Sequence, residues 1–290
     1  MPTSTEMKTF GWRGVEFAVP KEWSLSADTG RWENAYFILS DESTNPRLEV
    51  SWKRVKKLKN SIRDILDIYI KNVKKDLIKK SGDRSIIYNL RFTEKSKIVV
   101  NSHEGLYCYG IIYGQESFIG SWYCEDTNRL FLLQVNFMKD EREMYSAIVE
   151  RLISSFKCHK TDTKQFLWTT DSLKFYLPIE YILIDGQLNP AFSYLRYTVH
   201  REYKDLVIAY SDMASLVLSE YQKDILAWFK ENVIKRVLRG LRGYRLKFSK
   251  ERINNCGGVT VRGYSIIALP YIRRDVYGIA WFSEEDNRVY

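Results

Sequence analysis

Apolar residues recur at helical spacing in two segments of this chain, and they alternate with polar residues in much of the remainder. Within residues 61–80 the apolar positions are three or four residues apart, which predicts an amphipathic helix with one buried face. The buried stripe would consist of Ile62, Ile65, Leu66, Tyr69, Val73 and Leu77. A second helix is predicted in the later half of the chain, with the stripe Leu226, Phe229, Val233 and Val237.

The segments that precede each helix have the alternating pattern of β-strands. Residues 15–23 match residues 173–181, because apolar residues, a proline and a glutamate fall at corresponding positions. Pro20 and Pro178 are expected to end these two strands. Further strands are expected at 36–39 and 48–52 in the first half, and at 192–197 and 206–210 in the second.

A third match follows each helix and has the pattern of a β-hairpin. The glycine-flanked strand at 105–110 corresponds to 258–263, and residues 121–131 correspond to 280–290. Four identities anchor the longer match, in which Trp122, Glu125, Asn128 and Arg129 recur as Trp281, Glu284, Asn287 and Arg288. An acidic centre with Asn near its end is typical of a turn between two strands.

These matches predict an α+β fold of two tandem repeats, each an antiparallel sheet with packed helices. The first repeat would span residues 1–160 and the second residues 161–290, with a short polar linker at 158–164. The first continues with a strand at 132–137 and a helix at 141–157, whereas the second stops at Tyr290 and lacks both. The sheet face that this helix would bury is then left apolar and uncovered. We therefore expect the second repeat to be covered by the first repeat or by another chain.

The positive charge of the chain is concentrated around the two predicted helices. The net charge is +9, yet residues 53–80 hold 11 basic and 3 acidic residues, and residues 223–250 hold 9 basic and 2 acidic ones. The candidate binding residues on these helices are Lys71, Lys74, Lys75, Lys79, Lys235, Arg236, Arg239 and Arg242. A basic helix face is commonly just solvated, but it also attracts a nucleic-acid backbone or an acidic partner protein. Because no base-reading motif accompanies these residues, any nucleic-acid contact would be to phosphates and independent of sequence.

The sequence contains no motif for a catalytic, cofactor or metal site. Glycine-rich nucleotide-binding motifs, a serine-hydrolase elbow and a zinc-protease motif do not occur. His103, His159 and His200 have no pair at zinc-ligand spacing, and the adjacent Cys158 and His159 match no common metal pattern. Cys158 is interpreted as a small apolar residue at a helix end. We therefore predict no catalytic residue, no metal site and no cofactor.

The repeated hairpin has two interpretations. It could be a ligand platform that is used twice. Alternatively it is structural, with the tryptophans in the core, Glu and Arg paired across the hairpin, and Asn at positive φ. We favour the structural interpretation.

The order of elements resembles the PsbP-like fold, which has a strand, a turn with proline and an aromatic residue, further strands, a helix, a meander and a closing helix. The resemblance is carried by Phe17, Pro20, Trp23, Gly105 and residues 154–157 in the first half, and by Phe175, Pro178 and Gly258 in the second. Tyr181 stands in place of Trp23 in the second half. This fold is shared by the extrinsic PsbP protein of photosystem II, a eukaryotic Ran-binding protein and DcrB-type bacterial proteins. The resemblance implies an antiparallel sheet with helices on its faces, used mostly for binding rather than catalysis.

The sequence favours a non-enzymatic interaction protein that contacts a protein partner, or a second copy of itself, through the incomplete second repeat and the basic helices. One alternative is a sequence-independent nucleic-acid-binding protein. Another is a small-molecule carrier or enzyme with a pocket between the repeats, lined by some of the 20 tyrosines and 8 tryptophans. The sequence has no apolar run long enough to span a bilayer and no secretory signal at its start, so we expect a cytoplasmic protein.

Overall fold

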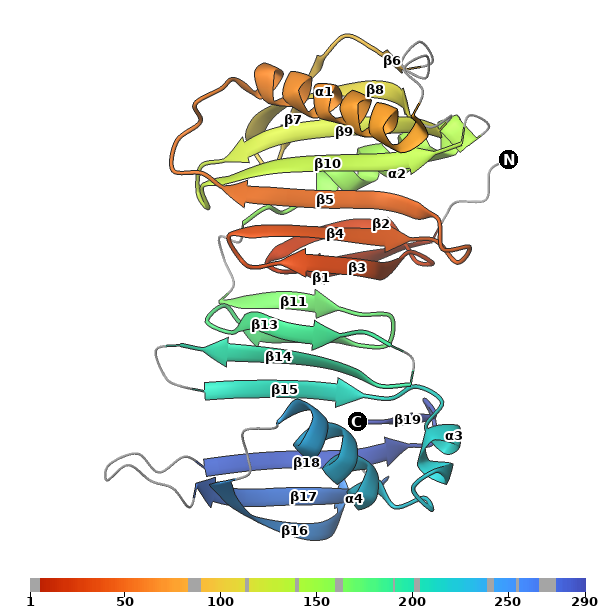
Figure 1. Ribbon diagram of the computed structural model, residues 1–290, viewed down its shortest axis with the longest axis vertical. Helices are drawn as coiled ribbons and strands as arrows, with labels where there is room; N and C mark the ends of the chain where they lie inside the picture. Colours follow the sequence, from red (N-terminus) through yellow and green to blue (C-terminus); the bar gives the residue numbers. More distant parts are fainter. Residues whose placement is uncertain are drawn as a thin grey trace. The chain divides into compact units, whose positions relative to one another are not determined.

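The chain divides into two units, Met1–Glu180 and Tyr181–Tyr290, each with its own sheets and helices (Figure 1). The computed structural model describes residues 6–82, 90–112, 115–138, 141–159, 164–189, 191–200, 204–238, 243–253, 256–265 and 275–290. Strands outnumber helices in both units, and the predicted α+β class is confirmed. Within the described ranges, no helix is both long and apolar enough to cross a membrane.

An eight-stranded antiparallel sheet organises the first unit. Its strand order is β3-β4-β5-β10-β9-β8-β6, and β7 also pairs with β8. The strands are β3 (Ser24–Gly30), β4 (Asn34–Ser40), β5 (Pro46–Arg54), β6 (Arg91–Phe92), β7 (Ser96–Val100), β8 (His103–Ile112), β9 (Gln115–Cys124) and β10 (Arg129–Phe137). Strands β9 and β10 are largely buried on both faces, as expected of central strands with cover on each side.

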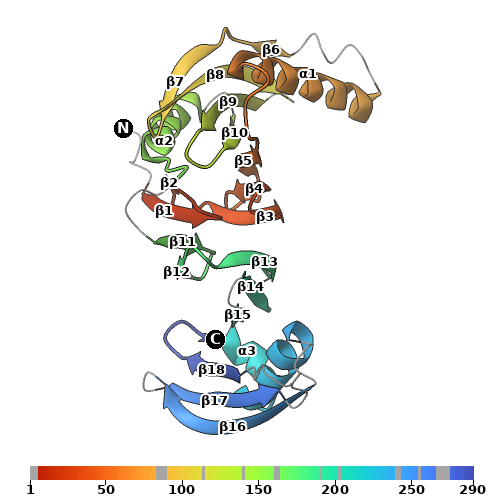
Figure 2. The same ribbon diagram turned by 90° about the vertical axis from the view of Figure 1, so that its left-hand side faces the viewer.

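Helix α1 (Ile62–Ser81) covers one face of this sheet, over β8 and β9 (Figures 1 and 2). Leu66 and Leu77 are fully buried in a cluster with Cys108 and Ile119 of those strands. Both leucines belong to the stripe that the spacing of apolar residues predicts. The apolar stripe therefore places α1 with Lys71, Lys75 and Lys79 away from the sheet.

The ends of α1 are fixed by its capping residues. The Ser61 side chain accepts a hydrogen bond from the backbone N–H of Asp64, and the Asp64 carboxylate accepts one from the backbone N–H of Ser61. Gly82 follows the helix in the left-handed region, at φ 69°. A capping box at the start and a left-handed glycine at the end explain why this helix lies within one residue of its prediction.

Helix α2 (Arg142–Ser155) and the hairpin of β1 (Met7–Trp12) and β2 (Val15–Pro20) cover the opposite face of the sheet. Trp122 of β9 stacks on Phe131 of β10 with ring centroids 5.1 Å apart. Both rings meet Phe156 edge-on, directly after α2, and Phe156 stacks on Phe17 of β2. The end of α2 is thereby held against the sheet by aromatic packing.

A second hairpin, formed by β11 (Gln165–Thr169) and β12 (Lys174–Pro178), belongs to the first unit. The backbone N–H of Gly11 donates to Thr169 Oγ1 at 3.1 Å, and Trp12 meets Trp168 edge-on at 5.2 Å. The compact unit therefore ends after Glu180, whereas the sequence match assigns the later hairpin to the second repeat. The repeat boundaries 1–160 and 161–290 stay a prediction about sequence, distinct from the compact units.

The second unit contains two small antiparallel sheets. Strands β13 (Ile182–Gln187), β14 (Ser193–Val199) and β15 (Lys204–Tyr210) form the first sheet. Strands β16 (Tyr244–Ile253), β17 (Cys256–Ser265), β18 (Asp275–Ser283) and β19 (Arg288–Val289) form the second. Ser211 and Val289 exchange backbone hydrogen bonds of 2.9 and 3.2 Å, which join the two sheets at one point.

The helical segment of the second unit differs from its prediction. It consists of α3 (Ala214–Ser219), which no pattern predicts, α4 (Ile225–Trp228) and the π-helix η3 (Phe229–Val237). The backbone N–H of Leu238 bonds five residues back, to the carbonyl of Val233, at 2.9 Å. Trp228 and Val233, also five residues apart, are therefore both buried against the sheet, whereas Leu226 of the predicted stripe is only partly buried.

The two hairpins that match in sequence also have the same local geometry. Asn128 and Asn287 have φ of 54° and 52°, so the predicted positive φ is confirmed. Trp122 and Trp281 each stack on the aromatic residue opposite, with centroids 5.1 and 4.9 Å apart. The sequence predicts that Arg129 pairs with a glutamate across the hairpin. Instead it donates hydrogen bonds to Thr127 Oγ1 and to the backbone carbonyl of Cys158. The likeness is local, and the duplication of whole units stays a prediction.

Candidate functional site

The predicted binding residues on α1 form a row of exposed lysines. Lys71, Lys75 and Lys79 are exposed and lie four residues apart, so they follow one line along the helix. Lys74 is half-buried, with its Nζ 5.8 Å from the ring centroid of Phe92. Three of the four predicted residues therefore face solvent together.

The predicted residues on the second helix are more dispersed. Lys235 pairs with Glu231 at 2.6 Å, and the guanidinium of Arg236 lies 5.2 Å from the ring centroid of Phe192. Arg239 and Arg242 lie outside the described residues. The predicted basic residues thus fall in two separate units.

One face of the sheet of β16, β17 and β18 carries aromatic, apolar and basic side chains that are open to solvent. Helices α4 and η3 lie against the other face (Figure 2). The strand register places Tyr277 beside Arg262 and Lys247 in one row, because residues directly opposite each other share a face. Ile279 lies in the next row, beside Thr260. We call these rows, with the flanking Tyr264, Trp281, Arg245, Asp275 and Glu251, the open face.

The open face corresponds to a face that is buried in the first unit. When the two hairpins are aligned on Trp122 and Trp281, Phe118 aligns with Tyr277. Phe118 is 2% exposed and Trp122 is 0% exposed, whereas Tyr277 is 75% exposed and Ile279 is 55% exposed. The described part of the second unit has no counterpart of α2 to cover these side chains.

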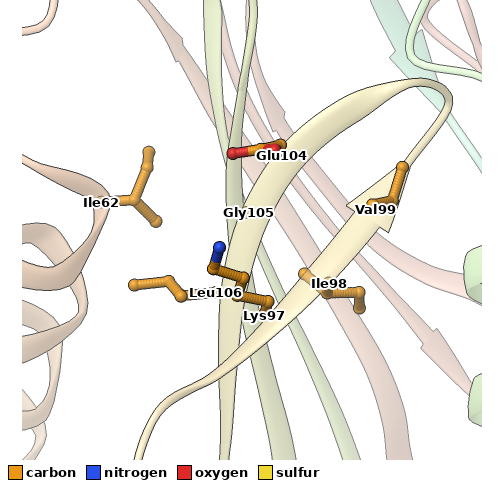
Figure 3. Close-up of a pocket in the computed structure, with 7 residues that line it drawn as sticks. All are labelled: Ile62, Lys97, Ile98, Val99, Glu104, Gly105 and Leu106. Atoms are coloured by element: carbon orange, nitrogen blue, oxygen red, sulfur yellow. The ribbon is translucent and has the colours of Figure 1, made fainter.

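Two cavities lie in the described part of the first unit. One, of about 210 Å³, lies where Leu106 points toward Ile62 of α1 beside the β7–β8 hairpin, and its polar side chains are Lys97 and Glu104 (Figure 3). The other, of about 550 Å³, is lined by Glu33, Arg54, Lys56 and Asn128. Among the described lining residues there is no cysteine, serine or histidine to act as a nucleophile or general base. The predicted pocket between the repeats stays a prediction.

Cys158 and His159, an adjacent pair without a recognisable motif, lie beside His103 and Cys124. One ligand atom from each of the four side chains falls within 4.8 Å of the others. His103 begins β8, Cys124 ends β9, and the other two follow α2, so three distant segments meet here. The segment predicted as a linker at 158–164 therefore begins inside the first unit. Among the described residues, this His–Cys cluster is the set that could hold a metal ion.

The two thiols of the His–Cys cluster share a hydrogen bond that separates their pKa values. Cys124 accepts this hydrogen bond from the Cys158 thiol, and the bond is the main cause that lowers the pKa of Cys124 to about 4. The same bond, together with burial, raises the pKa of Cys158. Thr127 Oγ1 also donates to Cys124 Sγ at 3.1 Å. Cys124 is therefore the thiol that ionises first.

Part of the His–Cys cluster could have been found from the sequence. Gly105 lies opposite Trp122 in the pairing of β8 with β9, and both residues stand out in the sequence match. His103 and Cys124 lie two residues beyond Gly105 and Trp122, at the same end of strands β8 and β9. Cys158 and His159 lie at this end of the strands because of how α2 packs against the sheet, and no local spacing in the sequence encodes that packing.

Comparisons with known proteins give little further guidance. No protein-family model and no curated protein matches the chain. Among solved structures it is similar to cyanobacterial PsbP (CyanoP) from Synechocystis, with a TM-score of 0.36 and 12% identity. That similarity covers 54% of this chain and 94% of the other. At this TM-score the similarity assigns no function to the chain.

Proposed function

We propose that this chain is a non-enzymatic interaction protein that pairs with a second copy of itself through the open face. The observation that carries the proposal is the contrast between Tyr277, which is 75% exposed, and its counterpart Phe118, which is 2% exposed. A cluster of exposed aromatic and aliphatic side chains beside arginine is typical of protein–protein contact surfaces. The open face therefore has the composition of an interface.

The charges on the open face favour a second copy as the occupant. Arg262 and Lys247 lie in the row of Tyr277, whereas Asp275 lies at the start of β18 and Glu251 near the end of β16. The contacts of a two-fold interface are reciprocal, so a basic patch away from the axis can meet the partner's acidic patch while the partner's basic patch meets this chain's acidic one. A face with both signs of charge can thus pair with itself without leaving like charges opposed.

The two repeats are, in this proposal, tandem copies of one PsbP-like unit. The shared geometry of the two hairpins supports a duplication, since Asn, Trp and the opposed aromatic ring occupy the same local positions in both. Self-association then covers the face that α2 covers in the first unit.

Replacing Tyr277 by Glu is expected to turn a dimer into a monomer. The substitution places a charge in the centre of the open face, where dimerisation would remove it from water. Light scattering on a size-exclusion column at micromolar concentration gives the mass directly. The matched control is Leu216→Glu, because Leu216 is also a large exposed apolar residue of the second unit, 64% exposed on α3.

A dimer for the unaltered chain and for Leu216→Glu, with a monomer for Tyr277→Glu, is the expected result. A wild-type monomer throughout the concentration range would contradict self-association. A Tyr277→Glu dimer would place the contact on another surface and equally overturn the proposal.

The row of exposed lysines on α1 favours a second candidate function, sequence-independent nucleic-acid binding. Wild-type chain would retard any DNA duplex at about 50 mM salt and lose affinity steeply as salt rises, because phosphate contacts release counterions. The triple change K71E, K75E and K79E should abolish the retardation. Nucleic-acid binding through α1 would be wrong if the triple variant still retarded DNA, or if the wild-type chain caused no retardation at low salt.

A further inference from the structure

Three of the six distances among the ligand atoms of the His–Cys cluster match the edges of a metal tetrahedron, and all six are within 4.8 Å. His159 Nδ1 lies 3.4 Å from each of three atoms, His103 Nε2, Cys124 Sγ and Cys158 Sγ. With Zn–N bonds of about 2.0–2.1 Å and Zn–S bonds of about 2.3 Å, the edges of a tetrahedral site are about 3.3–3.8 Å. These three edges of the cluster therefore have the lengths expected around Zn²⁺.

The burial of the cluster suits a structural ion. Cys124 and Cys158 are 0% exposed, and the side chains of His103 and His159 are 13% and 16% exposed. Buried cysteines often serve only as small apolar residues, but here both sulfur atoms are directed at an imidazole nitrogen. Apolar packing alone does not account for that orientation.

The groups around the cluster orient its ligands. Asp126 Oδ2 lies 3.5 Å from Nε2 of His159, the ring nitrogen that a metal at Nδ1 would leave free, and it also lies 3.5 Å from His103 Nε2. A carboxylate at this nitrogen fixes the tautomer and makes the ligand nitrogen more basic. Asn101 Nδ2 lies 3.1 Å from His159 Nδ1 and 3.4 Å from Cys158 Sγ, and Arg129 donates to the Cys158 carbonyl. Cys158 and its neighbour are thus held in place from both the side chain and the backbone.

The matched hairpin of the second unit does not repeat the cluster. Ser283 lies opposite Arg288 there, whereas Cys124 lies opposite Arg129 in the first unit. Cys124 is therefore not part of the motif that the two hairpins share.

We propose that the first unit binds one Zn²⁺ through His103 Nε2, Cys124 Sγ, Cys158 Sγ and His159 Nδ1. Two thiolates and two imidazoles are soft and borderline ligands, which excludes Mg²⁺ and Ca²⁺ and matches the tetrahedral preference of Zn²⁺. Four protein ligands leave no open position, so the ion is structural rather than catalytic. It joins the segment after α2 to the ends of β8 and β9.

The test is zinc binding by the full chain, stripped with a chelator under reducing conditions and titrated with Zn²⁺ against a chromophoric competitor. Wild type and Cys256→Ser, a partly exposed cysteine outside the cluster, should bind one equivalent. Cys124→Ser and Cys158→Ser should lose the tight site. Cobalt substitution should give the intense visible bands of a tetrahedral thiolate site in wild type and Cys256→Ser alone.

Asp126→Asn keeps the test informative if the cysteine variants do not fold, because Asp126 is half-exposed and outside the ligand set. Loss of this outer carboxylate should weaken zinc binding about 10- to 100-fold while circular dichroism stays unchanged. Failure of reduced wild type to bind Zn²⁺ would overturn the proposal. So would unaltered affinity in folded Cys124→Ser and Cys158→Ser.

Discussion

Removal of zinc from the first unit is expected to lower its melting temperature by about 8–16 °C. An ion that binds only the folded state stabilises it by about 4 kcal/mol when its free concentration is a thousandfold above Kd. For a unit of this size, each kcal/mol shifts the midpoint by about 2–4 °C. Differential scanning calorimetry of the full chain, with zinc and then with excess chelator, measures the shift.

The control for this shift is the double variant Cys124→Ser with Cys158→Ser, whose melting should be the same with zinc and with chelator. Wild-type melting that chelation leaves unchanged would mean that the His–Cys cluster contributes nothing to stability as a metal site. The proposed structural role of the ion would then be wrong.

Replacing Arg129 by Ala is expected to reduce the free energy of unfolding of the first unit by about 3–5 kcal/mol. Arg129 is 2% exposed, and its guanidinium lies 5.1–5.2 Å from the ring centroids of Trp32, Trp52 and Phe131. It also donates to the carbonyl of Cys158. Truncation leaves a cavity among three aromatic rings and a buried carbonyl without its donor.

Arg288 provides the matched control for this prediction, since it occupies the same position in the second hairpin. Its side chain is 28% exposed and pairs with Asp212 at 2.6 Å, so Arg288→Ala should cost only about 1 kcal/mol in the transition of the second unit. Guanidinium unfolding of zinc-loaded protein compares the two. Equal costs would show that burial among the aromatic rings does not set the importance of Arg129.

Helix α1 was predictable because its information is local. The apolar stripe, the Ser61–Asp64 capping box and Gly82 all lie within one stretch of sequence. The segment around Phe229 shows the limit of the same reasoning. Apolar positions three and four residues apart do not distinguish an α-helix from a π-helix. Trp228 and Val233 are both buried because they pack against strands β17 and β18, which lie later in the chain.

The His–Cys cluster escaped prediction for the opposite reason, because its information is almost entirely non-local. The register of β8 with β9 brings His103 and Cys124 together. Cys158 follows β10 and α2 in the chain, and the packing of these two elements places it beside them. Metal motifs in sequence are recognised when two ligands lie close together along the chain. Here the one adjacent pair, Cys158 and His159, is too common a dipeptide to predict a site by itself.

The most direct test of the zinc site is an anomalous difference map from crystals of the zinc-loaded chain, recorded on both sides of the zinc absorption edge. We predict one peak inside the cluster, about 2.0–2.1 Å from His103 Nε2 and His159 Nδ1 and about 2.3 Å from the two sulfur atoms. A map without a peak among these four side chains would contradict the account.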